Sequence, residues 1–174
     1  EAGRIIEAAR QSAAALKRLF ETICVSSLVT IAAAHGAAMG GGAGLVAACD
    51  LAVAADDLRL AFPEVRRGLV AALVTCLIRR QVGDRTAREL VLLGQTIGAQ
   101  DALAKRLINR VVPANELLAA ASDMVREVCL GAPGAIARTK ELLDELSPRP
   151  IAGELESAMR FHLDARHSPE AAEG

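Results

Sequence analysis

The sequence predicts an α/β fold followed by a mostly helical region, and three observations support this prediction. Short apolar runs typical of buried strands occur at residues 28–33 and 50–54. A run of glycines at residues 40–42 separates these two runs and leads into an alanine-rich segment typical of a short helix. The order of strand, glycine turn, helix and strand is characteristic of α/β proteins.

The expected elements follow from periodicity and from residues that begin or end helices. Apolar residues at steps of three and four predict the first helix over residues 4–23. Asp84 is the expected N-cap and Gly94 the expected C-cap of one helix, and Pro133 begins another. Including these two, the helices expected after the first one cover residues 43–49, 71–80, 84–93, 99–105, 115–130, 133–146 and about 152–166. The expected strands are 28–33, 50–54, 58–62 and 108–112.

Composition excludes several classes of function. The 174 residues fit one domain, and 52% of them are hydrophobic, so a substantial core is expected. The net charge of -1 and an aromatic fraction of 2% argue against a nucleic-acid partner. No apolar run reaches ~18 residues, so no membrane span is expected. The four cysteines form no Cys-x-x-Cys pair, which favours reduced thiols in the cytoplasm and no metal site.

The first candidate functional segment is residues 35–50, HGAAMGGGAGLVAACD. Three glycines let the backbone approach a ligand closely, and the free N–H groups of the following helix suit a phosphate or a developing oxyanion. The alternative is that the glycines only allow tight packing of a strand against a helix. A dinucleotide-binding loop is disfavoured because Leu45 interrupts the glycine pattern, and no Gly-Lys-Ser/Thr follows for a phosphate-binding loop of the nucleoside triphosphatases.

The second candidate segment is residues 62–69, FPEVRRGL. Glu64 follows Pro63 directly after a strand, among mostly apolar neighbours. A half-buried carboxyl group there would have a raised pKa and could act as a general acid or base near neutral pH. The alternative is a solvated glutamate that pairs with Arg66 or Arg67.

Together the two segments resemble the crotonase (enoyl-CoA hydratase/isomerase) family, most closely its methylglutaconyl-CoA hydratase-like branch. The joint spacing of the motifs makes the resemblance specific. The matching pieces are His-Gly at 35–36, Gly-Gly-Gly at 40–42, Cys-Asp at 49–50, Pro-Glu at 63–64, Gly-Leu at 68–69 and the stretch LLGQTIGAQDALAKRLINRVVP at 92–113.

The resemblance implies a spiral of ββα units, a fold shared with caseinolytic-type peptidases, followed by a helical trimerisation region. We expect residues 1–112 to form part of the spiral core with the oxyanion loop, and residues 113–174 to form the oligomerisation region of a homotrimer or hexamer. The implied ligand is an acyl-CoA thioester, with no cofactor beyond the coenzyme A of the substrate. The backbone N–H of Gly41 is the implied oxyanion donor and Glu64 the implied catalytic acid or base. The implied substrate-binding residues are Met39, Gly40, Gly42, Gly44 and Leu69.

The sequence also departs from the family pattern. Gly44 stands where many members have a first glutamate, and 71–72 is Ala-Ala where many have Pro-Gly. The first ββα elements of the family, with the second oxyanion donor, are expected to be missing from this chain. Ala38 has no hydroxyl group at the position of the peptidase nucleophile. The predicted function is hydration of 2-enoyl-CoA thioesters through an enolate. An enoyl-CoA isomerase, an acyl-CoA decarboxylase and a non-catalytic acyl-CoA-binding subunit remain as alternatives.

Overall fold

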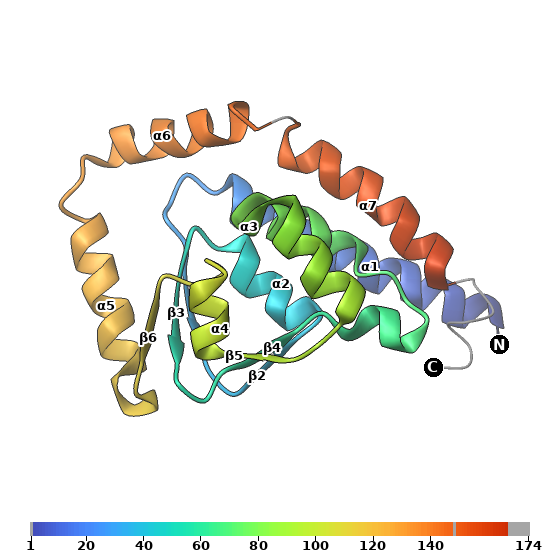
Figure 1. Cartoon of the computed structure of the whole chain (residues 1–174). Helices are drawn as coiled ribbons and strands as arrows, with labels where there is room; N and C mark the ends of the chain where they lie inside the picture. The colour runs from blue at the N-terminus through green and yellow to red at the C-terminus, as the bar shows by residue number, and fades with distance from the viewer. Residues whose placement is uncertain (1, 148, 167–174) are drawn as a thin grey trace.

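The computed structural model describes residues 2–147 and 149–166, which form two small sheets surrounded by helices (Figure 1). The strands are β1 (Ile31–Ala34), β2 (Ala37–Met39), β3 (Leu51–Ala55), β4 (Arg59–Ala61), β5 (Ile97–Gly98) and β6 (Arg110–Val112). The helices are α1 (Ala2–Val25), α2 (Gly41–Ala48), α3 (Ala72–Leu93), α4 (Ala99–Ala104), α5 (Leu117–Val128), α6 (Pro133–Glu145) and α7 (Ile151–Arg166), with 3₁₀ turns η1 (Pro63–Arg67) and η2 (Ala114–Glu116).

The first four strands alternate between the two sheets. The first sheet has the order β1-β3-β6 with all strands parallel, and the second has β2-β4-β5 with β2 and β4 parallel and β5 antiparallel. Each pair of strands, β1 with β2 and β3 with β4, therefore crosses from one sheet to the other before the chain enters the next helical element. The predicted α/β fold is confirmed.

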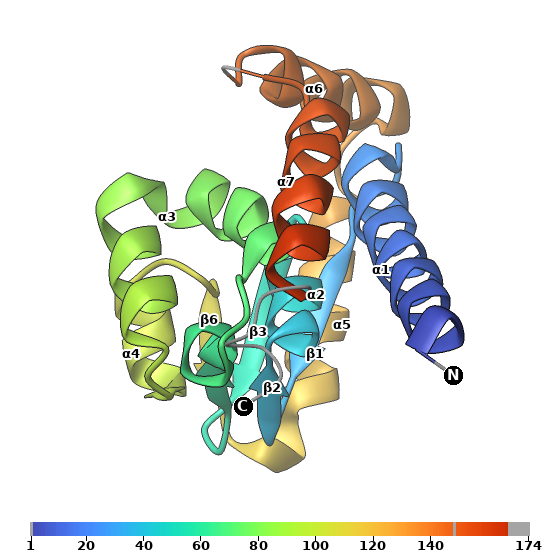
Figure 2. The same cartoon turned by 90° about the vertical axis from the view of Figure 1, so that its right-hand side faces the viewer.

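The core lies where α1, α2, α3 and α7 meet above the sheets (Figure 2). Many of its side chains are alanines, which let helices and strands approach closely. Phe20 on α1 and Phe62 after β4 are the largest side chains that are fully buried. Leucine and isoleucine side chains such as Leu60, Leu77 and Ile78 fill much of the remaining core.

Several boundaries differ from the predicted ones. Helix α2 begins at Gly41 rather than at residue 43, and the short strands β2 and β5 were not expected. The helices predicted at 71–80 and 84–93 join in α3 around Gly83, whose φ of 73° breaks the helical geometry. Asp84 is not an N-cap, because its carboxylate pairs with Arg79 instead. Gly94 is the C-cap as predicted, with a φ of 56° and its N–H donating to the carbonyl of Leu90.

The helices after residue 113 are attached to the first part in different ways. Helix α5 packs on β1 and β3, and α7 returns to α1 and α3. The division into regions 1–112 and 113–174 stays a prediction, and residues 167–174 lie outside the described residues. Within the part that the structure describes, no helix combines the length and hydrophobicity that a membrane crossing requires.

Replacement of Phe20 by alanine should lower the free energy of unfolding by about 3–5 kcal/mol, because it leaves a cavity in a fully buried site. The neighbouring Leu19 is 45% exposed, so Leu19→Ala should change stability by less than about 1 kcal/mol. Denaturant titration of both variants measures the difference. Equal losses would show that α1 is not packed as described.

Candidate active site

Pairing of β2 with β4 brings the two predicted functional segments together. Met39 lies opposite Ala61 in the parallel register, and the N–H of Gly40 donates to the carbonyl oxygen of Ala61 over 2.9 Å. The glycine turn follows β2 directly, and Pro63 and Glu64 come two and three residues after Ala61. The end of this small sheet therefore carries both the glycine turn and the acidic residue.

The glycine turn leaves N–H groups at the start of α2 without an acceptor among the described residues. Gly40 caps the helix with a φ of 52°, a conformation that favours glycine. The first hydrogen bond of the helix runs from the N–H of Gly44 to the carbonyl of Gly40 over 2.9 Å. The N–H groups of Gly41 and Gly42 precede this bond, so they have no acceptor within the helix. Their partial positive charge suits an oxyanion.

The backbone of Glu64 is fixed by the turn that follows it. Its carbonyl oxygen accepts hydrogen bonds from the N–H groups of Gly68 and Leu69, the latter over 2.9 Å. Its side chain points back to the glycine turn, where Oε1 lies 3.0 Å from the place that a Cβ on Gly40 would occupy. The φ of Gly40 favours glycine, and any side chain at position 40 would in addition press on the Glu64 carboxylate.

The Glu64 carboxyl group is poorly solvated. Its Oε2 is buried and has no hydrogen-bond partner among the described residues. Burial raises the pKa of Glu64, while a hydrogen bond from its own backbone and the charge of Arg67 act in the opposite direction. Arg66 donates its Nε–H to the carbonyl of Leu93 rather than to this carboxylate. A solvated Glu64 paired with Arg66 is thus not what the structure shows.

Helix α1 supplies two neighbours of the glycine turn that the sequence did not indicate. Leu16 Cδ2 lies 3.6 Å from a Cβ placed on Gly41. Phe20 Cζ and Val74 Cγ1 each lie 2.6 Å from a Cβ placed on Gly44, so Gly44 faces the packed core between α1 and α3. Helical periodicity predicted α1 but could not say which segment its apolar face would meet.

The remaining predicted residues flank the turn. Met39 precedes it and is 37% exposed, and the N–H of Leu69 is one of the two groups that anchor Glu64. The roles of Met39, Gly40, Gly42, Gly44 and Leu69 in substrate binding stay predictions.

Two clefts lie elsewhere on the surface. A cleft of about 780 Å³ lies under α6, and one of about 490 Å³ lies between α3 and α7. Neither lining includes Gly41 or Glu64. The candidate active site is therefore defined by the N–H groups of the glycine turn and the Glu64 carboxylate, and not by either of these two clefts.

The fold and this site define the chain as a crotonase-like protein, and sequence comparison supports the same conclusion. The sequence profile described as "Enoyl-CoA hydratase/isomerase" matches residues 2–174. The chain belongs to the enoyl-CoA hydratase/isomerase family, as the resemblance implied.

Relatives share both sequence and fold with the chain. A Thermus thermophilus protein that carries the provisional name enoyl-CoA hydratase is 42% identical over 128 residues, 74% of this chain and 51% of that protein. Carnitinyl-CoA dehydratase of Escherichia coli K12 is 33% identical over 153 residues, 83% of this chain and 57% of that protein. A crystal structure of an enoyl-CoA hydratase from Mycobacterium avium superposes with a TM-score of 0.84 at 29% identity, covering 97% of this chain and 66% of that one.

These matches confirm the predicted crotonase-like fold. The chain spans about half the length of the curated relatives that it matches.

Gly44→Ala should destabilise the protein by about 1–3 kcal/mol, because the added methyl group would overlap Phe20 and Val74 in a packed core. Gly42 lies in the same helix and has nothing within 4 Å of an added Cβ. Gly42→Ala should therefore be neutral or stabilise by up to about 1 kcal/mol, as alanine does in a helix. Thermal unfolding of the two variants tests the difference, and a Gly44→Ala protein as stable as Gly42→Ala would contradict the packing.

Glu64→Gln should raise the free energy of unfolding at neutral pH. Because the pKa of Glu64 is raised in the folded protein, its ionisation weakens the fold as pH rises through its ordinary value of 4.5 toward the folded value. The advantage of the glutamine variant should grow over that window and vanish below it. Urea titrations across this pH range test the sign. Glu141→Gln, on the exposed surface of α6, is the matched control for replacement of a carboxylate by an amide.

Proposed function

We propose that the protein containing this chain is an enoyl-CoA hydratase-like lyase that acts on 2-enoyl-CoA thioesters through an oxyanion-stabilised enolate. The observation that carries the proposal is the position of the Glu64 carboxylate beside Gly40, one residue from the free N–H of Gly41. A donor for a developing oxyanion and a carboxyl group suited to proton transfer thus lie at the same end of the β2–β4 pair. The family membership and the hydratase names of relatives support the same class of reaction.

The proposed reaction uses both groups in turn. The thioester oxygen accepts a hydrogen bond from the Gly41 N–H, which stabilises negative charge on that oxygen as the enolate forms. Water adds at C3 and gives one proton to the Glu64 carboxylate, and the protonated Glu64 then returns a proton to C2. The raised pKa of Glu64 favours this exchange, since both protonation states become accessible closer to neutral pH.

Isomerisation of 3-enoyl-CoA thioesters is the second candidate function, and one observation favours it. Gly44 faces Phe20 and Val74, so an acidic side chain could not be added there without displacing them. A single carboxylate can remove a proton from C2 and return it at C4, which leaves the acid as it began. This reaction needs neither a second acid nor a water molecule.

The partners and location belong to the proposal as well. Exposed leucines on and after α5 and α6 support self-association of the helical region as a homotrimer or hexamer; they are Leu118, Leu130, Leu142, Leu143 and Leu146. We propose a cytoplasmic protein that needs no cofactor beyond the coenzyme A of its substrate.

Glu64→Gln should lower turnover of an enoyl-CoA thioester by at least ~10², because it removes the proton-transfer group and keeps its size. Affinity for the thioester should change little. Steady-state kinetics and calorimetric binding with crotonyl-CoA measure the two quantities, with Glu141→Gln as a matched control that should retain full turnover. Nearly full turnover by Glu64→Gln would reject the assignment.

The substrate decides between the two candidate reactions. A hydratase should consume the conjugated absorbance of a 2-enoyl thioester and form a 3-hydroxyacyl product, whereas an isomerase should create that absorbance from a 3-enoyl thioester. Chromatography of the products from both substrates separates these outcomes. Thioester binding with neither product would favour a non-catalytic acyl-CoA-binding protein.

A further inference from the structure

The 3₁₀ turn η1, which carries Glu64, contacts the C-terminal end of α3. Arg66 donates its Nε–H to the carbonyl oxygen of Leu93 over 3.1 Å. Leu93 is the last residue of α3, and the final carbonyl groups of a helix have no N–H partner within the helix. The bond from Arg66 therefore satisfies a carbonyl group that the helix leaves open, and it joins η1 to α3.

Gly94 allows η1 to approach this helix end closely. A Cβ on Gly94 would lie 3.2 Å from Cγ2 of Val65 and 3.4 Å from both Cγ and Nε of Arg66. The φ of Gly94 is 56°, a conformation that favours glycine. The residue that ends α3 thus also leaves the space in which Val65 and Arg66 pack against the helix.

The carboxyl group of Glu64 follows the backbone of its own turn. It accepts a hydrogen bond from its own backbone N–H, and its Oε2 has no hydrogen-bond partner among the described residues. The carbonyl oxygen of Glu64 accepts hydrogen bonds from the N–H groups of Gly68 and Leu69, so residues 64–69 form one hydrogen-bonded unit. The position of the carboxyl group beside Gly40 therefore depends on the orientation of the whole turn.

Two attachments on different sides fix this orientation. Before the turn begins, β4 pairs with β2 and the ring of Phe62 is fully buried. After Glu64, Val65 and Arg66 meet the end of α3. A turn that is attached on one side can tilt about that side, whereas the second attachment removes this freedom.

From this geometry we infer that Arg66 is a positioning residue: its bond to the Leu93 carbonyl holds η1 against α3 and thereby keeps the Glu64 carboxyl group beside the glycine turn. The importance of this position for turnover rests on the proposed function. Proton transfer needs the carboxyl group within hydrogen-bond reach of the reacting atom, and a misplacement of about 1 Å can cost ~10² in rate. Arg66 acts through Glu64 and has no contact with the reacting atoms in this scheme.

Arg66→Met should lower kcat for an enoyl-CoA thioester by about tenfold in the protein that contains this chain, with little change in KM, because the carboxyl group remains but is less well placed. Arg67→Met is the matched control, since it removes the same charge from the next residue and Arg67 has no hydrogen bond or ion pair among the described residues. Arg67→Met should retain kcat.

The pH dependence separates the two arginines further. The charge of Arg67 lowers the pKa of Glu64, so Arg67→Met should move the acidic limb of the kcat/KM profile to higher pH. Arg66→Met should instead lower turnover across the whole profile. Both side chains are exposed within this chain, so the midpoint of thermal unfolding should change little in either variant.

Crystal structures of the two variants measure the position of the carboxyl group apart from activity. In Arg66→Met the Glu64 side chain should leave Gly40 or occupy more than one conformer, and in Arg67→Met it should stay. An unmoved Glu64 in Arg66→Met would overturn the inference, and so would an unaltered kcat in an assay where Glu64→Gln is impaired. Full turnover by Glu64→Gln would instead reject the proposed function, and the crystal structures would still decide whether Arg66 positions Glu64.

Discussion

The parallel pairing of β2 with β4 is the contact on which the candidate site depends. Both strands are only three residues long, yet their register sets the end of the glycine turn beside the end of β4. The hydrogen bond from the Gly40 N–H to Ala61 closes this pair. Because Pro63 and η1 follow at once, Glu64 has little freedom to lie anywhere else. A shift of register by one residue would separate the free N–H groups from the carboxylate.

This placement creates a conflict between stability and chemistry at Glu64. A buried carboxylate oxygen without a hydrogen-bond partner destabilises the folded state, since burial disfavours its charged form. The neighbouring arginines do not relieve this cost fully, because Arg66 is engaged with Leu93. Groups with raised pKa values beside free N–H donors are typical of active sites, although structural ion-pair networks also perturb pKa values. Glu64 belongs to no ion pair in the described part of the chain, which favours the functional interpretation.

The sequence predicted the long elements and the two motifs, and it failed where structure depends on contacts between distant segments. Strand β2 is Ala-Ala-Met, which is too short for an apolar period and has weak strand preference, so only its partner β4 defines it. Asp84 had the chemistry of an N-cap, but Arg79 on the preceding turn of α3 competes for its carboxylate. The environment of Gly44 was likewise hidden, because Phe20 lies 24 residues earlier and Val74 lies 30 residues later.

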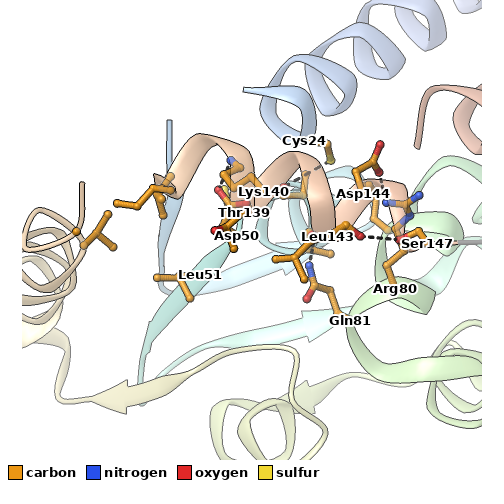
Figure 3. A pocket seen from close by; sticks show the side chains of 18 of the residues that line it. Cys24, Asp50, Leu51, Arg80, Gln81, Thr139, Lys140, Leu143, Asp144 and Ser147 are labelled. Carbon is orange, nitrogen blue, oxygen red and sulfur yellow. Dashed lines mark hydrogen bonds and ion pairs between the residues drawn. The ribbon is translucent and has the colours of Figure 1, made fainter. Parts of the chain in front are cut away.

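Different interactions attach the successive helices after residue 113 to the rest of the chain. Helix α5 buries Leu117 and Ala120 with Val53 and Ala55 of β3, and α7 buries three side chains in the main core. Helix α6 lies between these two anchored helices and contributes no buried side chain of its own. Within the described chain, α6 is tied to the rest of the protein by the ion pairs of Lys140 with Asp50 and of Asp144 with Arg80 (Figure 3). The glycine turn lies at the other extreme, since Phe20 and Val74 leave Gly44 no room for even one methyl group. The chain thus has a tightly packed turn at the place where the proposed reaction needs fixed geometry.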